Sequence, residues 1–169
     1  MAVLTCPGEL VPEVREAVQR QWPRWQTILT PRGDPQAEAA ALVKLWGRPG
    51  DLVVIQQDKV PPPGSIHRLL ECVHPWCGHE TPIDGRLHRE TLGLVRWRGE
   101  LKLRWPDLMR SALTRAENDG QLCAWPQGDM RISRWMRIQG IRWHNHEPPV
   151  VHRHGERGRW LDVSAQEAW

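Results

Sequence analysis

The segment Asp51-Leu-Val-Val-Ile-Gln-Gln-Asp58-Lys-Val-Pro-Pro-Pro-Gly64 joins a short apolar run to an acidic residue and then to a proline-rich stop. Residues 52–55 are apolar and mostly β-branched, which is typical of a buried strand bounded by turn signals. In an open α/β sheet, the carboxyl ends of the strands border the ligand crevice. We therefore expect Asp58 to lie where a phosphate-bound metal ion or a sugar hydroxyl could meet it. A simple acidic turn after a strand would give the same local pattern.

The sequence on both sides of this strand alternates between strand and helix patterns. Strand patterns occupy residues 2–5 and 26–30, and helix patterns occupy 13–21, 34–46 and 65–70. Asp34-Pro35 is a good start for the second helix, because Asp can cap a helix and Pro fits its first turn. An alternation of this kind predicts βαβ units and an α/β fold with an open, mostly parallel sheet flanked by helices.

The rest of the chain is less regular. Residues 72–87 are rich in Pro, Gly and His, and we expect them to form a loop. A strand is predicted at 92–97 and helices at 106–117 and 129–139, while residues 100–104 either pair with the preceding strand or open a helix. No repeat or domain linker interrupts the chain, so a compact single domain is expected.

Composition narrows the class of protein. The 169 residues suffice for a real core, and 40% hydrophobic with 25% charged residues is the composition of a globular protein. The positive residues behind the net charge of +3 are dispersed, which suits an anionic ligand without requiring nucleic acid. Eleven tryptophans, with no phenylalanine or tyrosine, must supply the aromatic packing, so we expect most of them to be structural.

The expected compartment is the cytoplasm. No apolar run approaches the roughly 20 residues of a membrane span, and residues 1–10 lack the pattern of a secretory signal. Four cysteines in such a chain are expected to be reduced thiols. The sequence has neither a Walker-type loop nor a G-x-G-x-x-G fingerprint, which argues against a nucleoside triphosphatase and a dehydrogenase.

Six short motifs follow one another in an order that carries a family resemblance. They are Cys6-Pro7-Gly8, Gln56-Gln57-Asp58, Cys72-Val-His-Pro-Trp-Cys77, Thr91-Leu-Gly93, Trp125-Pro-Gln-Gly-Asp129 and Val150-Val-His152-Arg-His154. In this order the chain resembles a compact GT-A glycosyltransferase of the inverting family-two type, including small versions from actinobacteria and their phages. The resemblance implies a nucleotide-binding half at 1–70 and an acceptor and catalytic half at 71–169.

Two positions depart from the family's pattern. Gln56 stands in place of the first carboxylate of the DXD motif, and Gly128 stands in place of the glutamate that usually precedes the catalytic aspartate. The first change leaves a neutral carbonyl where the family has an acid, so weaker metal binding is expected. The loss of the full acidic pair also keeps open a non-catalytic GT-A-like protein that binds a sugar nucleotide, a nucleic acid or a protein partner.

The resemblance implies transfer of a sugar from a nucleotide-diphosphate donor to an acceptor hydroxyl, with Mn²⁺ or Mg²⁺ on the diphosphate. Asp129 would be the catalytic base, although a simple helix N-cap would explain this Asp equally well. Asp58 and His152, or His154, would bind the metal ion. The nucleotide would contact Pro7, Glu9, Asp34 and Gln56. The acceptor is left open between a glycan, a protein and a modified DNA base.

Zinc is the alternative metal ion. His144 and His146 are spaced two apart, as are His152 and His154, so the members of each pair would point the same way on an extended segment. Either pair could combine with Cys72 and Cys77, whose spacing just reaches that of a closed zinc site. This combination leaves open a zinc-stabilised module that binds nucleic acid.

Overall fold

The apolar run after Asp51 forms β3 (Leu52–Gln56), a central strand of a six-stranded sheet. The computed structural model describes residues 2–6, 11–29, 36–83, 85–114, 122, 127–156 and 159–163. At 2–6, 27–29, 154–156 and 159–163 this description covers the backbone path. The sheet has the strand order β2-β1-β3-β8-β5-β9, so β3 lies between a strand from each half of the chain.

The first seventy residues follow the predicted alternation of strands and helices. Their elements are β1 (Ala2–Cys6), α1 (Pro12–Gln21), β2 (Gln26–Leu29), α2 (Ala37–Trp46), β3, β4 (Lys59–Val60) and α3 (Ser65–Glu71). β1 runs parallel to both β2 and β3, as two βαβ units require. The short β4 follows β3 after the two-residue turn at Gln57 and Asp58.

The second half contains more strands than the sequence predicts. Its elements are β5 (Trp76–His79), β6 (Thr81–Ile83), β7 (Arg86–His88), β8 (Leu94–Trp97), α4 (Gly99–Arg104), α5 (Leu108–Leu113), α6 (Gln127–Ile138), β9 (His144–His146), β10 (Val151–Glu156) and β11 (Arg159–Val163). The prediction of a loop at 72–87 is therefore wrong. Residues 76–79 form a fully buried strand in which Trp143 and the carbonyl of Leu94 leave no room for a side chain at Gly78.

The main sheet is mixed. β8 runs antiparallel to its neighbours β3 and β5, whereas β9 runs parallel to β5. Two small sheets complete the strands, with the orders β11-β10-β4 and β6-β7. The pairing of β10 with β4 places His152 opposite Lys59 and so beside the turn that contains Asp58.

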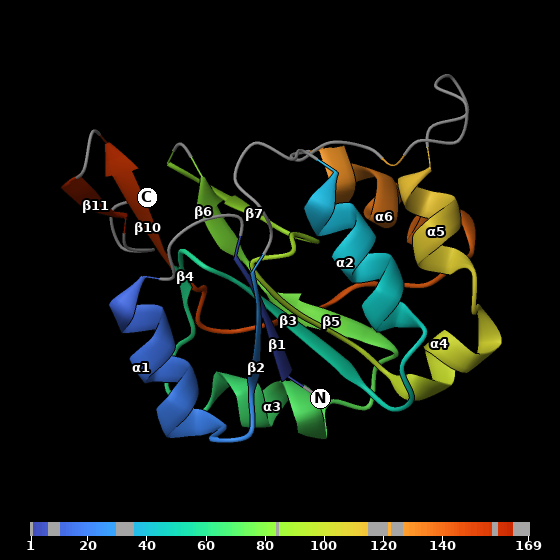
Figure 1. Cartoon of the computed structure of the whole chain (residues 1–169), viewed down its shortest axis with the longest axis horizontal. Coiled ribbons are helices and arrows are strands. Elements are labelled where there is room, and N and C mark those ends of the chain that lie inside the picture. Colours follow the sequence, from blue (N-terminus) through green and yellow to red (C-terminus); the bar gives the residue numbers. More distant parts are fainter. Residues whose placement is uncertain are drawn as a thin grey trace.

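Two hydrophobic cores lie on opposite faces of the main sheet. Leu52 and Val54 of β3 pack with residues of α2, α4, α5 and α6, while Val53 and Ile55 pack with residues of α1 and α3. Figure 1 shows the two groups of helices separated by the sheet. Alternate side chains of a strand point to opposite faces, so the unbroken apolar run of β3 matches its burial on both sides.

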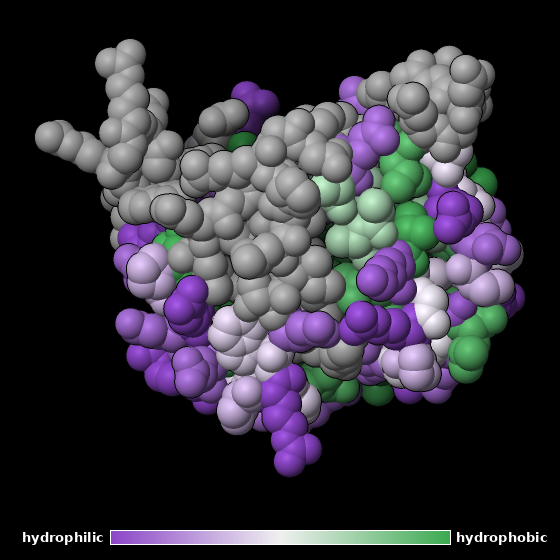
Figure 2. Space-filling view, viewed as in Figure 1, coloured by the Kyte–Doolittle hydropathy of each residue, from purple (hydrophilic) through white to green (hydrophobic). Residues whose placement is uncertain are grey.

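Polar side chains cover much of the surface coloured in Figure 2, with smaller hydrophobic areas on the side of α2, α4 and α5. Tryptophans contribute strongly to the core, as expected: Trp46, Trp76 and Trp97 are all buried. No helix in the described ranges is both long enough and apolar enough to span a bilayer.

Candidate functional site

Asp58 lies in the turn that joins β3 to β4, at the carboxyl edge of the parallel strands β1 and β3. Its backbone carbonyl accepts a hydrogen bond of 2.8 Å from the N–H of Arg153, which fixes the turn against β10. Both carboxylate oxygens contact cationic or ring nitrogens: Oδ1 accepts from Lys59 Nζ at 2.7 Å, and Oδ2 lies 3.1 Å from His152 Nε2. The side chain is thus held in one orientation by two neighbours.

His152 is buried on β10, and both of its ring nitrogens face oxygen atoms. Nδ1 lies 2.7 Å from the carbonyl oxygen of Pro82, which can only accept a hydrogen bond, so Nδ1 is the donor. Nε2 then faces the carboxylate of Asp58. A ring held in this way by a backbone carbonyl has the orientation typical of a metal-ligating histidine, whose second nitrogen is fixed by an outer partner.

Lys59 supplies a buried positive charge at the centre of this region. Its side chain is only 6% exposed and forms an ion pair with Asp58. Burial lowers the pKa of Lys59, while the negative charge of Asp58 opposes that shift most strongly. Asp129 and Glu38 act on Lys59 in the same direction as Asp58, so their carboxylates also lie within electrostatic range of this ammonium.

Burial raises the pKa of Asp58, but the hydrogen bond with His152 and the charge of Lys59 outweigh it. The pKa of Asp58 therefore lies below its usual value, and this carboxylate is ionised at neutral pH. An ionised carboxylate is the form that binds a divalent cation.

Asp129 lies in the first turn of α6, and its carboxylate behaves differently. Oδ2 accepts a hydrogen bond of 3.2 Å from the N–H of Leu92, while Oδ1 is buried without a hydrogen-bond partner among the described residues. Burial raises the pKa of Asp129 to about 7; the charge of Glu38 adds to that rise, and the hydrogen bond from Leu92 opposes it. The alternative of a simple N-cap is wrong, because α6 begins two residues earlier, at Gln127.

Glu38 is a further residue of this group that was not among the predicted site residues. This side chain of α2 is 5% exposed and affects the pKa values of both Lys59 and Asp129. A signal was present in the sequence. Glu38, Leu42 and Leu45 share one helical face, and an acid on an apolar face is unusual unless it has a charged neighbour.

Thr91-Leu-Gly93 forms the wall behind Lys59. The hydroxyls of Thr91 and Thr81 are hydrogen-bonded at 2.7 Å, and a Cβ at Gly93 would overlap Thr81 Oγ1 and lie 3.4 Å from Cγ of Lys59. Glycine at position 93 therefore lets the hydroxyl of Thr81 approach the backbone, next to the stem of Lys59. This close approach is a physical reason for the glycine in the Thr91-Leu-Gly93 motif.

The remaining predicted site residues are divided between described and undescribed positions. Gln56 is the last residue of β3 and is buried. Pro7, Glu9 and Asp34 lie outside the described residues, as does the side chain of His154, whose backbone belongs to β10. Their predicted roles stay predictions.

Two arginines, Arg89 and Arg96, lie in different surroundings. Arg96 is buried and donates two hydrogen bonds to Asp51 Oδ2, at 2.9 and 2.6 Å, and one of 2.6 Å to the carbonyl of Cys72. Arg89 is exposed and pairs with Glu80 at 2.6 Å. Arg96 thus stabilises the fold, and neither guanidinium contacts Asp58.

A second group of polar side chains, separate from the group around Lys59, lies around β5. Ligand atoms of Cys72, Cys77 and His146 all lie within 4.8 Å of one another. Within the part of the chain that the structure describes, this is the one group of three or more such side chains close enough to share a metal ion. The predicted combination of the cysteines with a member of the His144 and His146 pair is therefore present in space.

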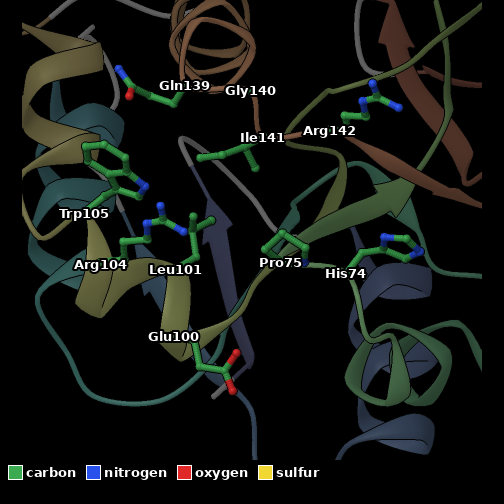
Figure 3. A pocket seen from close by; sticks show the side chains of 10 residues that line it. All are labelled: His74, Pro75, Glu100, Leu101, Arg104, Trp105, Gln139, Gly140, Ile141 and Arg142. Carbon is green, nitrogen blue, oxygen red and sulfur yellow. The ribbon is translucent and has the colours of Figure 1, made fainter.

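A pocket of about 410 Å³ opens at a third position (Figure 3). Its lining residues come from the segment before β5, from α4 and from the loop after α6: His74, Pro75, Glu100, Leu101, Arg104, Trp105, Gln139, Gly140, Ile141 and Arg142. None of them belongs to the group around Lys59. This pocket is therefore separate from the predicted site.

Asp58 Oδ2 and His152 Nε2 would serve as two ligands of a hard divalent cation such as Mn²⁺ or Mg²⁺ when the cation replaces the proton of the hydrogen bond between them. Adjacent ligand atoms in an octahedral shell with bonds of about 2.1 Å lie roughly 3 Å apart, and Asp58 Oδ2 and His152 Nε2 are separated by 3.1 Å. Two protein ligands are enough, since Mg²⁺ usually takes its other ligands from phosphates and water. The fit thus depends on donor chemistry and spacing rather than on a complete protein cage.

Comparisons with known proteins identify the fold alone. No family model matches the sequence, and no curated protein matches it. Among solved structures, A197 from STIV superposes with a TM-score of 0.59 at 9% identity, covering 98% of this chain and 91% of that one. A protein from Desulfovibrio desulfuricans G20, provisionally described as a nucleotide-diphospho-sugar transferase, gives a TM-score of 0.44 at 11% identity over 86% and 78% of the two chains. The chain shares its fold with A197, and the second similarity carries no further argument.

Proposed function

We propose that this protein transfers a sugar from a nucleoside-diphosphate donor to an acceptor hydroxyl. One observation is the main support: Asp58, Asp129 and His152 come from distant segments, Asp58 and Asp129 both act on the buried ammonium of Lys59, and His152 contacts Asp58. They do so at the carboxyl edge of β1 and β3, the part of an open α/β sheet that commonly binds ligands. The order of sequence motifs and the GT-A resemblance that it implies support the same function.

Asp129 is the proposed base. Its Oδ1 atom would accept the proton of the acceptor hydroxyl while the hydroxyl oxygen forms a bond to the anomeric carbon of the sugar. The bond from that carbon to the diphosphate oxygen breaks, and the nucleoside diphosphate leaves with the electron pair, which inverts the anomeric configuration. A carboxylate with a pKa of about 7, and with one oxygen that has no partner among the described residues, suits proton transfer near neutral pH.

Asp58 and His152 would hold Mn²⁺ or Mg²⁺, with His154 as an additional proposed ligand. When bound, such an ion stabilises the negative charge that grows on the departing diphosphate. Lys59 keeps Asp58 ionised, and the carbonyl of Pro82 orients the ring of His152. The replacement of an acid by Gln56 is expected to weaken metal binding rather than abolish it.

The two halves of the chain would divide the substrates. Residues 1–70 would bind the nucleotide, with Pro7, Glu9 and Asp34 after the amino-terminal strands and Gln56 at the end of β3. Residues 71–169 would bind the acceptor, a glycan, a protein or a modified DNA base, and would carry Asp129.

Release of nucleoside diphosphate tests the proposal. The protein is incubated with a panel of UDP- and GDP-sugars plus Mn²⁺, and the wild type is compared with Asp129→Asn and with Asp107→Asn, an exposed acid at the start of α5. We expect release by the wild type and by Asp107→Asn, and loss of about 100-fold or more in Asp129→Asn. Donor binding without release from any sugar would instead identify a non-catalytic binding protein, and steeply salt-sensitive DNA binding would favour the nucleic-acid module.

A further inference from the structure

Cys72, Cys77 and His146 belong to three different elements that meet on the α3 side of the sheet. Cys72 is the C-cap residue of α3, Cys77 is the second residue of β5, and His146 ends β9. β5 and β9 are parallel neighbours, paired Cys77 to His144 and His79 to His146. The segment between α3 and β5 brings Cys77 close to Cys72, although four residues separate them.

We propose that these three side chains bind one zinc ion. Their ligand atoms lie within 4.8 Å of one another, whereas the ligands of a tetrahedral zinc ion with bonds of about 2.0–2.3 Å lie roughly 3.5–3.8 Å apart. The atoms need to approach by about 1 Å, which small side-chain rotations can supply. Cys72 is only half-buried and follows a helix end, so it has room for this movement.

The surroundings suit a soft metal ion. Nε2 of His146 is buried and has no hydrogen-bond partner among the residues that the structure describes. Its lone pair is therefore available to a metal ion. The ring of His144 lies 4.8 Å from that of His146, measured between centroids, which makes His144 or a water molecule the candidate for the fourth position. Thiolates select zinc over Mn²⁺ and Mg²⁺, so this site would not compete with Asp58 and His152 for the same ion.

Charge balance is also favourable. Binding converts two thiols to thiolates and releases two protons, so the complex of Zn²⁺ with both cysteines and a neutral His146 carries no net charge. Arg96 acts electrostatically on Cys77 from the same face of the sheet and is already neutralised by Asp51. Burial raises the pKa of the Cys77 thiol to about 12, so metal binding at this residue has to displace a proton.

The zinc ion would cross-link α3, β5 and β9. These elements connect residue 72 with residue 146, so the link closes a long loop and should stabilise the carboxyl-terminal part of the main sheet. The site is separate from the proposed transferase site, and it therefore stands or falls independently of sugar transfer.

Metal content and cobalt substitution test this inference. The full chain is purified under reducing conditions, its zinc content is measured, and zinc is exchanged for Co²⁺, whose thiolate charge-transfer bands report cysteine ligation. The variants are Cys72→Ser, Cys77→Ser and His146→Asn, with His88→Gln as a matched control because His88 is an exposed histidine of β7.

We expect one zinc ion per chain in the wild type and in His88→Gln, a fall in melting temperature when a chelator removes it, and at least tenfold weaker binding in each of the three ligand variants. In the two cysteine variants, the thiolate-to-Co²⁺ charge-transfer bands should be weaker than in the wild type. Absence of zinc and cobalt binding by the reduced wild type, or binding that the cysteine variants leave unchanged, would overturn the proposal. A disulfide between Cys72 and Cys77 that persists in reductant would overturn it as well.

Discussion

Oδ2 of Asp58 lies 3.1 Å from Nε2 of His152, although 94 positions separate the two residues in the sequence. The contact follows from two local features: the turn after β3 exposes Asp58 at the carboxyl edge of the sheet, and the antiparallel pairing of β10 with β4 brings His152 to the same place. Lys59 follows Asp58 as the first residue of β4, and its Nζ donates to the other oxygen of Asp58 at 2.7 Å. A carboxylate, a histidine and an ammonium thus form one charged cluster.

The ion pair of Asp58 and Lys59 should be visible in a double-mutant cycle. Asp58→Asn leaves a buried ammonium without its carboxylate, so we expect a loss of about 3 kcal/mol in the free energy of unfolding. The double variant with Lys59→Met removes both charges and should recover most of that loss, yet sugar transfer should stay at least about 100-fold below the wild type. Urea unfolding and product release provide the two measurements.

This prediction differs from what the sequence alone suggests, since a crevice carboxylate would be expected to contribute little to stability. Asp107→Asn serves as the control, and it should change neither quantity. Strict additivity of the two single losses in the double variant would show that the pair does not interact.

The activity of Asp129 as a base should depend on pH. Its pKa of about 7 means that half of the carboxyl groups are protonated at that pH, and only the ionised form can accept a proton. We expect kcat/KM for transfer to rise with pH to a plateau above neutrality, with a midpoint near 7. A pH profile measured with saturating metal ion checks this, and a flat profile between pH 5 and 8 would exclude Asp129 as the base.

Stability should vary with pH in the opposite direction. The pKa of Asp129 rises from its usual 3.8 to about 7 in the folded protein, so the protonated carboxyl stabilises the fold below pH 4 and this contribution is lost as the pH rises through 7. Relative to Asp129→Asn, the wild type should lose up to about 4 kcal/mol over this range. Urea unfolding of both proteins at pH 4, 6 and 8 measures the difference, which should be constant if Asp129 keeps its ordinary pKa.

Glu38 should tune Asp129 without touching the substrate. Its negative charge raises the pKa of Asp129, so Glu38→Gln should move the midpoint of the activity profile to lower pH, by up to about one pH unit, while the plateau rate changes little. Glu13→Gln on the exposed face of α1 is the matched control. A lower plateau with an unmoved midpoint would mean that Glu38 acts through packing alone.

Gly93 should not tolerate even a methyl group. In Gly93→Ala the new Cβ overlaps Thr81 Oγ1, so we expect a loss of about 1–3 kcal/mol in stability together with reduced transfer. Gly47→Ala is the control, because the nearest atom to its added Cβ is 3.7 Å away. Combining Gly93→Ala with Thr81→Ala should restore part of the stability. If it restores none, the overlap with Thr81 Oγ1 is not the cause of the loss.

Much of the first half of the fold could be predicted from the sequence. The apolar run at 52–55 and the helix patterns on either side of it predicted the alternation of strands and helices, and α6 with its stop at Gly140 was also predicted. The predicted helix start at Asp34-Pro35 lies outside the described residues. The strands at 76–88 could not be predicted, because their Pro, Gly and His content is that of a loop. Gly78 is buried between neighbours that only the tertiary structure supplies.

Candidate site residues could be predicted where they follow a strand or begin a helix. They were harder to predict where the pairing of distant strands determines their position. Asp58 and Asp129 follow from strand-end and helix-start patterns, whereas the contact of His152 with Asp58 depends on the pairing of β10 with β4. The burial of Lys59 beside Asp58 likewise depends on tertiary packing and could not be predicted from its position in the sequence. Glu38 could have been singled out by its place on the apolar face of α2, but its partners come from other elements that only the tertiary structure brings together.

Paramagnetic broadening by Mn²⁺ tests most directly whether Asp58, Asp129 and His152 share one metal-dependent donor site. ¹⁵N-labelled protein is titrated with Mn²⁺ and UDP or GDP, and the loss of each amide signal is mapped onto the chain. We predict that the signals of Asp58, Leu92, Asp129 and His152 broaden together while those of α4 at 99–104 stay sharp. Broadening centred elsewhere in the protein, or none at these four residues, would contradict the account.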